Sequence, residues 1–297
     1  MRRTVVAASL LALALTLPSL AAPRVRNLAN MKKGELTKIA APAKAPTKLG
    51  QLPGKLNPVR ANVISCESSE FAFVFPISGN VAGGFGTFFR TEITLINYLD
   101  TPQVIGVGWL ALGQDNTDGD FEYFTMEAGE WASYPDFVGD VLDKTGLGAI
   151  LIVAFDAQTG EVDEFAEIDG TSRIYTASNG GQASQTFPSV SVVDSVDDFT
   201  AVALGLRHGN GFRTNAGVLN LDSVQHTWTV FGGNGGEFTI TVPPLSVVQA
   251  AVPANFPTSN GFLVLGFEPD ASGFEWSAYA SSNDNVTGDG WVSRATQ

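Results

Sequence analysis

After residue 63, apolar and polar positions alternate in short runs, which is the pattern of strands that bury one face. The clearest run spans residues 89–97, where one face carries the side chains of Phe89, Thr91, Ile93 and Leu95. Such runs recur at intervals of about 8 to 15 residues, with Gly, Asn, Asp and Pro between them. No window has the spacing of a long amphipathic helix. The pattern therefore predicts an all-β fold made of antiparallel β-sandwiches.

The strand pattern also occurs twice. Phe89-Arg90-Thr91 begins a strand that ends at Asn97, and Phe212-Arg213-Thr214 begins one that ends at Asn220. Further along, residues 173–178 align with residues 277–282. Each copy yields about seven short strands, which predicts two tandem immunoglobulin-like sandwiches over residues 63–192 and 193–297. We expect Phe89 and Phe212 to be equivalent core residues, with Phe88 on the opposite face.

The polar residues of the repeated strand have structural interpretations. Arg90 and Arg213 point away from the apolar face, where each could bind a ligand carboxylate. We expect instead that each pairs with an acid on a neighbouring strand, or covers the end of its sandwich with its aliphatic stem. Asn97 and Asn220 stand where a strand gives way to a turn, and Asx-turn hydrogen bonding accounts for both.

These motifs resemble a module known from other proteins. The residues that carry the resemblance are Val74-Phe75-Pro76, Phe88–Thr91 with Asn97, Gly205-Leu206-Arg207 before Phe212–Asn215, and Tyr279 with Asp284-Asn285. Together they resemble a poorly characterised tandem β-sandwich module of secreted bacterial proteins, over nearly all of residues 70–297. The resemblance implies a β-sandwich fold and a location outside the cell, and no catalytic residues. The first copy departs at its end, where Asn179-Gly180-Gly181 replaces the Asp-rich turn.

The N-terminus has the features of an export signal. Arg2 and Arg3 precede an apolar run from Val5 to Leu20, and Ser19-Leu20-Ala21 fits a signal-peptidase site. A membrane anchor is the alternative, but the run is short for a span and contains a proline. No later run is long and apolar enough to cross a bilayer. We predict a signal peptide over residues 1–21 and a mature protein that is extracellular or periplasmic.

Charge divides the rest of the chain into a basic segment and an acidic body. Residues 22–62 are rich in Ala, Pro, Lys and Arg and predict a flexible basic linker, which could either grip an anionic surface or serve as a solvated leader. Residues 61–297 hold six basic against 29 acidic residues, and the whole chain has a formal net charge of −13. This balance excludes nucleic acid as a partner, because phosphate binding needs a basic face. The single cysteine, Cys66, excludes an internal disulfide.

One loop concentrates the oxygen ligands that calcium prefers. Asp115, Asp118 and Asp120 lie within six residues of each other in a hairpin. Their spacing does not match an EF-hand, and an acidic hairpin can simply be solvated. Calcium at these residues is the only cofactor that the sequence suggests, with Asp284, Asn285 and Asp289 as a weaker second candidate.

Tryptophans suggest a different ligand. Trp131 and Trp291 lie near predicted turns, where an exposed indole could stack on a sugar ring. Trp109, Trp228 and Trp276 lie among apolar neighbours and are expected in the core.

No catalytic motif is present, since the chain lacks a nucleophile elbow, a zinc-binding helix motif and a phosphate-cradling loop. We therefore predict a secreted, non-catalytic structural, adhesive or recognition protein of the bacterial cell exterior, with a polysaccharide or a cell-surface protein as partner. The alternative is a lectin-like module that binds carbohydrate or depends on calcium. A secreted hydrolase with an unrecognised site is the third interpretation.

Overall fold

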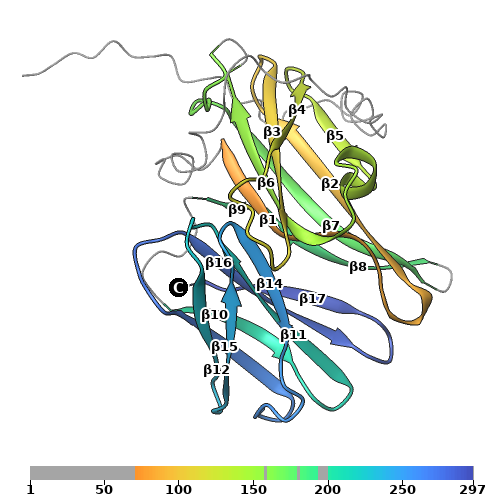
Figure 1. Ribbon diagram of the computed structural model, residues 1–297. Helices are drawn as coiled ribbons and strands as arrows, with labels where there is room; N and C mark the ends of the chain where they lie inside the picture. The colour runs from red at the N-terminus through yellow and green to blue at the C-terminus, as the bar shows by residue number, and fades with distance from the viewer. Residues whose placement is uncertain (1–70, 157–158, 179–180, 193–199, 297) are drawn as a thin grey trace, which may run out of the picture.

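A computed structural model describes residues 71–156, 159–178, 181–192 and 200–296 (Figure 1). The predicted signal peptide, the predicted linker and Cys66 lie outside these residues. The described chain is built from antiparallel strands, with helical turns only at η3 (Gly84–Gly86) and η4 (Phe137–Val141) in that part. The all-β prediction is confirmed. No helix within these ranges is long and apolar enough to cross a membrane.

The first half of the body packs two sheets face to face. Sheet A contains, in order, β4 (Phe121–Met126), β3 (Gln103–Ala111), β6 (Gly146–Phe155) and β1 (Ala72–Ala82), and β9 (Val190–Ser191) also pairs with β1. Sheet B contains β5 (Trp131–Tyr134), β2 (Phe88–Asn97), β7 (Ile168–Ser178) and β8 (Gly181–Pro188). The end of β1 pairs with β2, so this strand passes from one sheet into the other.

The second half repeats this strand order. Sheet D contains β13 (Glu237–Val242), β12 (His226–Gly232), β15 (Phe262–Pro269) and β10 (Ala201–Arg207), and sheet C contains β14 (Ser246–Ala251), β11 (Phe212–Asn220), β16 (Trp276–Asp284) and β17 (Gly290–Arg294). Counted from the first strand of each half, β1 to β8 correspond one by one to β10 to β17. This correspondence supports the predicted internal repeat, while the immunoglobulin-like classification stays a prediction.

A buried asparagine fixes the same corner in both halves. The Asn97 side-chain amide donates to the carbonyl oxygens of Thr101 (2.8 Å) and Glu127 (3.1 Å), and its oxygen accepts from the Leu99 N–H (3.0 Å). Asn220 repeats the pattern with its own neighbours, Val224 (2.7 Å), Pro243 (3.1 Å), Val242 (3.3 Å) and Asp222 (3.0 Å). The predicted Asx turns are confirmed. Each asparagine additionally ties its turn to the end of a strand in the facing sheet.

Strand register corrects one part of the predicted repeat alignment. Arg90 lies opposite Tyr175, whereas Arg213 lies opposite Asn283. Tyr175 therefore corresponds to Asn283 and not to Tyr279, so the alignment of residues 173–178 with 277–282 is wrong by four positions. The sequence comparison was misled because the corresponding strands β7 and β16 carry similar residue types four positions out of register.

The predicted core role of Phe89 and Phe212 is also wrong. Both rings are half-buried and lie outside the two buried clusters, although Thr91, Ile93 and Leu95 on the same face as Phe89 are buried as expected. Each phenylalanine stands near the start of its strand, beyond the cover of the facing sheet of its own half. Phe88, with 40% exposure, does lie on the opposite face.

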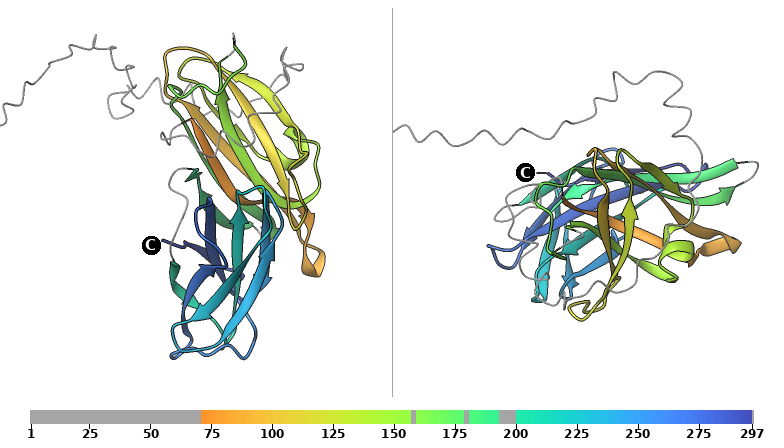
Figure 2. Two further views of the ribbon diagram at one scale, coloured as in Figure 1. Left: turned by 60° about the vertical axis from the view of Figure 1, so that its left-hand side comes forward. Right: turned by 90° about the horizontal axis from the view of Figure 1, so that it is seen from above.

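The two halves lie end to end and share a buried cluster (Figure 2). Tyr279 of β16 projects from the outer face of sheet C and packs edge-on against Phe187 of β8, with ring centroids 5.6 Å apart. Its hydroxyl donates to Gln249 Oε1 at 2.9 Å, and burial raises the pKa of Tyr279. Gly217 leaves room for the ring, because a Cβ there would lie 2.1 Å from it.

Replacing Gly217 by alanine should push Tyr279 out of this position. We expect Gly217→Ala to lower the free energy of unfolding by about 1–3 kcal/mol through overpacking. Gly233→Ala is the matched control, because its Cβ would meet no atom closer than 3.5 Å. Urea denaturation measures both variants, and equal losses would show that the contact with Tyr279 does not hold the halves together.

Asn97 and Asn220 should contribute equally to the free energy of unfolding if the two halves are copies of one fold. Asn97→Ala and Asn220→Ala each leave buried backbone groups without partners, which should cost about 1–3 kcal/mol of unfolding free energy. Asn234→Ala, in the exposed turn between β12 and β13, should change little. Chemical denaturation of the three variants tests this, and a loss in one half only would contradict an equivalent role.

Candidate functional site: a cleft between the two halves

A cleft of about 500 Å³ lies where the long hairpin of β7 and β8 passes alongside β16 and β17 (Figure 1). Both halves line it. The first half contributes Gly84, Thr87, Phe89, Ile174, Thr176, Ala177, Ala183, Ser184 and Gln185, and the second contributes Arg213, Asn283, Asp284, Asn285 and Gly288. Most polar groups in it are therefore neutral amides and hydroxyls.

The wall from the first half is the far end of the inner face of sheet B. Phe89 lies opposite Thr176, which in turn lies opposite Ala183. Thr91 starts the neighbouring row, which continues through Ile174 to Gln185. Because side chains alternate along each strand, these rows face the same way as the buried core residues. They line the cleft because the second half, and not sheet A, stands opposite them.

The wall from the second half is the outer face of sheet C. Arg213 and Asn283 lie opposite one another on β11 and β16, on the same face as the buried Tyr279. The Gln185 amide donates to Asn283 Oδ1 at 2.9 Å and bridges the two halves. The cleft thus continues the interface beyond Tyr279, at the point where apolar contacts give way to amides.

The turn after β16 is held by its own hydrogen bonds. Asp284 Oδ1 accepts the backbone N–H of Val286 at 2.7 Å and that of Thr287 at 3.4 Å. These bonds, the one from Val286 above all, lower the pKa of Asp284, so its carboxylate stays charged at neutral pH. Asn285 is held by its N–H, which donates to the Gly211 carbonyl at 2.9 Å.

Arg213 differs from its counterpart in the first half. Arg90 forms an ion pair with Asp136, with 3.2 Å between Nε and Oδ2, and its guanidinium lies over the Phe88 ring. Arg213 Nη1 instead donates to the neutral amide oxygen of Asn285 at 2.6 Å, and no carboxylate of the described residues forms an ion pair with it. Arg90 therefore has an acid partner as expected, but this acid precedes η4 and does not lie on a neighbouring strand. For Arg213 the expected acid partner is wrong.

The wall from the first half contains an unsatisfied hydroxyl. Thr176 is only 6% exposed, and its Oγ1 finds no hydrogen-bond partner in the described part of the chain. Buried polar groups usually have a partner, so this hydroxyl is an exception beside the cleft, although its oxygen is itself shielded from solvent.

The predicted calcium residues do not converge on one point. Asp115, Asp118 and Asp120 are exposed in the loop between β3 and β4, and Asp115 accepts both the N–H (3.0 Å) and the hydroxyl (2.7 Å) of Thr117. These bonds lower the pKa of Asp115. Across the described ranges, no three His, Cys, Asp or Glu side chains are grouped so that they could hold a metal ion. Calcium binding here stays an untested prediction.

The same loop instead joins the two halves through Asn116. Its side chain bonds to both backbone groups of Ala111, at 3.0 and 3.1 Å, and donates to the Leu245 carbonyl in the second half at 2.9 Å. Its backbone N–H donates to the Pro244 carbonyl at 3.2 Å. The sequence left calcium and a solvated acidic hairpin as interpretations of this loop. The role of Asn116 was not predicted, because its partner Leu245 lies 129 residues away.

The two tryptophans predicted to bind sugar, Trp131 and Trp291, lie in different halves and do not form a common surface. Trp131 is 42% exposed on edge strand β5, at the outer end of the first half. Trp291 is half-buried on β17, where its indole N–H donates to the Gly205 carbonyl at 3.0 Å. Trp291 lies opposite Ser282 and so faces away from the cleft. The expected core residues Trp228 and Trp276 are fully buried, whereas Trp109 is only partly buried.

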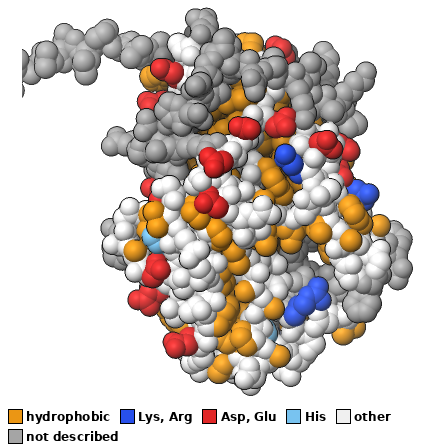
Figure 3. Space-filling view, in the orientation of Figure 1, with side chains coloured by type: hydrophobic (Ala, Val, Ile, Leu, Met, Phe, Trp, Pro, Cys, Tyr) orange, Lys and Arg blue, Asp and Glu red, His pale blue; other side chains and the backbone are white. Residues whose placement is uncertain are grey.

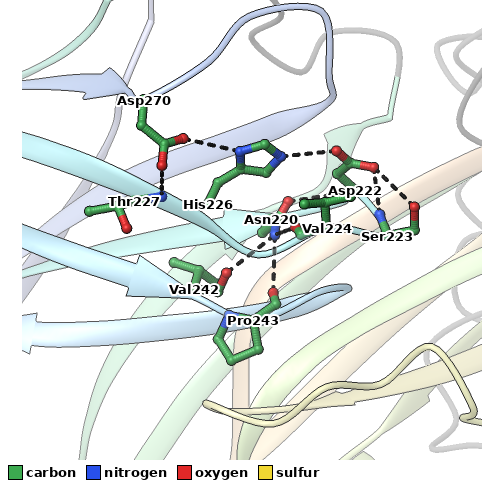
Figure 4. A network of polar contacts seen from close by, with 9 residues as sticks. All are labelled: Asn220, Asp222, Ser223, Val224, His226, Thr227, Val242, Pro243 and Asp270. Atoms are coloured by element: carbon green, nitrogen blue, oxygen red, sulfur yellow. Dashed lines mark hydrogen bonds and ion pairs between the residues drawn. The ribbon is translucent and has the colours of Figure 1, made fainter.

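A second polar network surrounds His226 (Figure 4). Its Nε2 lies 2.9 Å from Asp222 Oδ2 and its Nδ1 lies 3.1 Å from Asp270 Oδ1, while the ring stacks on Phe274 with centroids 3.7 Å apart. Both ring nitrogens are occupied, so neither is available to a substrate or a metal ion. The network ties the turn after β11 to the turn after β15. Sequence gave no signal for it, because Asp270 is 44 residues away from His226.

Asn116 should therefore contribute more to the stability of the protein than the acidic residues around it. We expect Asn116→Ala to lower the free energy of unfolding by about 1–3 kcal/mol, because it leaves backbone groups at the junction of the halves unpaired. Gln114→Ala, an exposed neighbour in the same loop, is the control and should be nearly neutral. Thermal unfolding of both variants measures the difference, and equal effects would contradict a clamp at Asn116.

Comparison with known proteins adds no family to this geometry. The sequence matches no family model, and a search of curated proteins also finds no match. The resemblance to a tandem module of secreted bacterial proteins consequently stays a prediction. Any functional assignment has to come from the chemistry of the cleft.

Proposed function

We propose that the protein is a secreted, non-catalytic recognition protein of a bacterial cell exterior, and that the cleft between its halves binds a polysaccharide chain. The single observation that supports this proposal is the lining of the cleft. It combines side-chain amides and hydroxyls with an apolar strip of Phe89, Ile174, Ala177 and Ala183.

This combination suits a sugar. Hydroxyl groups of a sugar both donate and accept hydrogen bonds, and the side-chain amides of Gln185, Asn283 and Asn285 can do the same. The C–H faces of a sugar ring are apolar and pack well against rings such as Phe89. The volume of the cleft lies within the range of about 300–1,000 Å³ that is usual for ligand sites.

The lining is less suited to the rival interpretation as a hydrolase. The titratable side chains that line the cleft are Arg213 and Asp284, and the Asp284 carboxylate already accepts two backbone N–H groups. General acid–base hydrolysis of a glycoside needs a pair of carboxyl groups at a defined separation. Recognition without chemistry is therefore the function that the cleft supports best.

A glycan array tests the proposal. The purified protein should retain a subset of glycans, and Ala183→Phe, which fills the floor of the cleft, should abolish their binding. Ala251→Phe is the matched control, because Ala251 is exposed on edge strand β14 and lies outside the cleft. Melting curves establish that both variants fold. Retention of no glycan, or binding that Ala183→Phe leaves intact, would contradict the proposal.

A further inference from the structure

We infer that the polysaccharide bound in the cleft is a polyuronate, and that Arg213 pairs with its carboxylate. This inference rests on the proposed function, because it names the ligand class of the same cleft. A uronate unit presents one carboxylate beside ring hydroxyls, and the cleft presents one guanidinium beside amides and hydroxyls. The carboxylate would pair with the guanidinium, and the ring hydroxyls would bond to the amides and hydroxyls of the cleft.

The body has few basic residues, so the partners of each one can be compared. Only six basic residues stand against 29 acidic ones in residues 61–297, so acids are available on every side. Acidic side chains are spread over both halves of the face in Figure 3, and basic ones are few. Arg90 and Arg173 form ion pairs with Asp136 and Glu92. Arg213, like Lys144 and Arg207, forms no ion pair within the described residues. Of these three residues Arg213 alone lines the cleft, where its exposed guanidinium can meet an external anion.

The internal repeat provides the comparison that isolates this feature. Arg90 and Arg213 occupy the same position on corresponding strands, and their polar partners differ in charge. Asp136 neutralises Arg90, whereas Asn285 offers Arg213 a neutral oxygen that occupies one of its five N–H donors. The remaining donors are sufficient for the two parallel hydrogen bonds that a carboxylate can accept.

The neighbours of Arg213 favour a sugar acid over an acidic peptide. Thr87, Gln185 and Asn283 line the same cleft and can bond to hydroxyls on the ring that carries the carboxylate. The unsatisfied hydroxyl of Thr176 lies in the wall formed by the first half.

Calorimetry with hexagalacturonate and its methyl ester tests the inference. The two probes share the same sugar rings, and only the first is charged. The protein should bind hexagalacturonate about tenfold more tightly than the ester, which is the expected size of one lost charge-assisted pair. Hexaglutamate measures any attraction of a simple polyanion to the basic residues 22–60, which all variants share.

Variants at Arg213 locate the effect. Arg213→Gln should weaken hexagalacturonate binding about tenfold and leave the ester unchanged, while Arg213→Lys should retain part of the preference because it keeps the charge without the planar fork. Arg207→Ala is the matched control, because Arg207 lies over the Phe262 ring, 3.6 Å from its centroid, and does not line the cleft. It should bind both probes as the unmodified protein does. Unchanged melting curves establish that the variants fold.

The outcomes separate this inference from the proposed function. Equal binding of acid and ester, with no effect of Arg213→Gln, would overturn the polyuronate and leave a neutral glycan as ligand. Hexaglutamate binding that is as tight and as dependent on Arg213 would overturn the sugar in favour of an acidic peptide. Absence of binding to every probe, together with an empty glycan array, would overturn the proposed function itself.

Discussion

The contact of Tyr279 with Gly217 and Phe187 decides how the two halves are arranged. Tyr279 projects outward from sheet C, where a side chain would normally meet water, and is buried only because Phe187 of sheet B covers it. Gly217 makes this possible, since any side chain there would occupy the position of the ring. The inner face of sheet B is thereby shared between sheet A and the second half. The cleft exists because that shared face extends past the last apolar contact.

The repeated strand order gives the molecule two kinds of position. Asn97 and Asn220 make equivalent hydrogen bonds, because each stands at the same corner of its half. Arg90 and Arg213 have diverged in what they contact, since one faces solvent beside its own half and the other faces a neighbouring half. Differences between copies therefore mark the places where the arrangement of the halves, and not the fold of each half, sets the chemistry.

Hydrogen-bond partners also distinguish structural polar groups from those that could bind a ligand. The acid-rich loop after β3 and the network around His226 both look like candidate sites, but their polar atoms already bond within the protein. Their physical role is to hold turns together and, at Asn116, to connect the halves. The cleft differs because the Arg213 guanidinium in its wall bonds to a neutral amide and forms no ion pair with the described chain.

The sequence by itself determined the all-β fold, the buried face of β2 from Thr91 to Leu95 and the two asparagine corners. Alternation with a period of two and hydrogen bonds within a few residues are local properties, which neighbouring residues encode. It also placed Phe88 opposite Phe89 correctly. Only the tertiary structure decided that Phe89 lines a cleft, that Asn285 faces Arg213 from 72 residues away, and that Gln185 bridges to Asn283 across 98 residues. These contacts depend on how one sheet packs on another, and sheet packing sums many small contacts that no short segment contains.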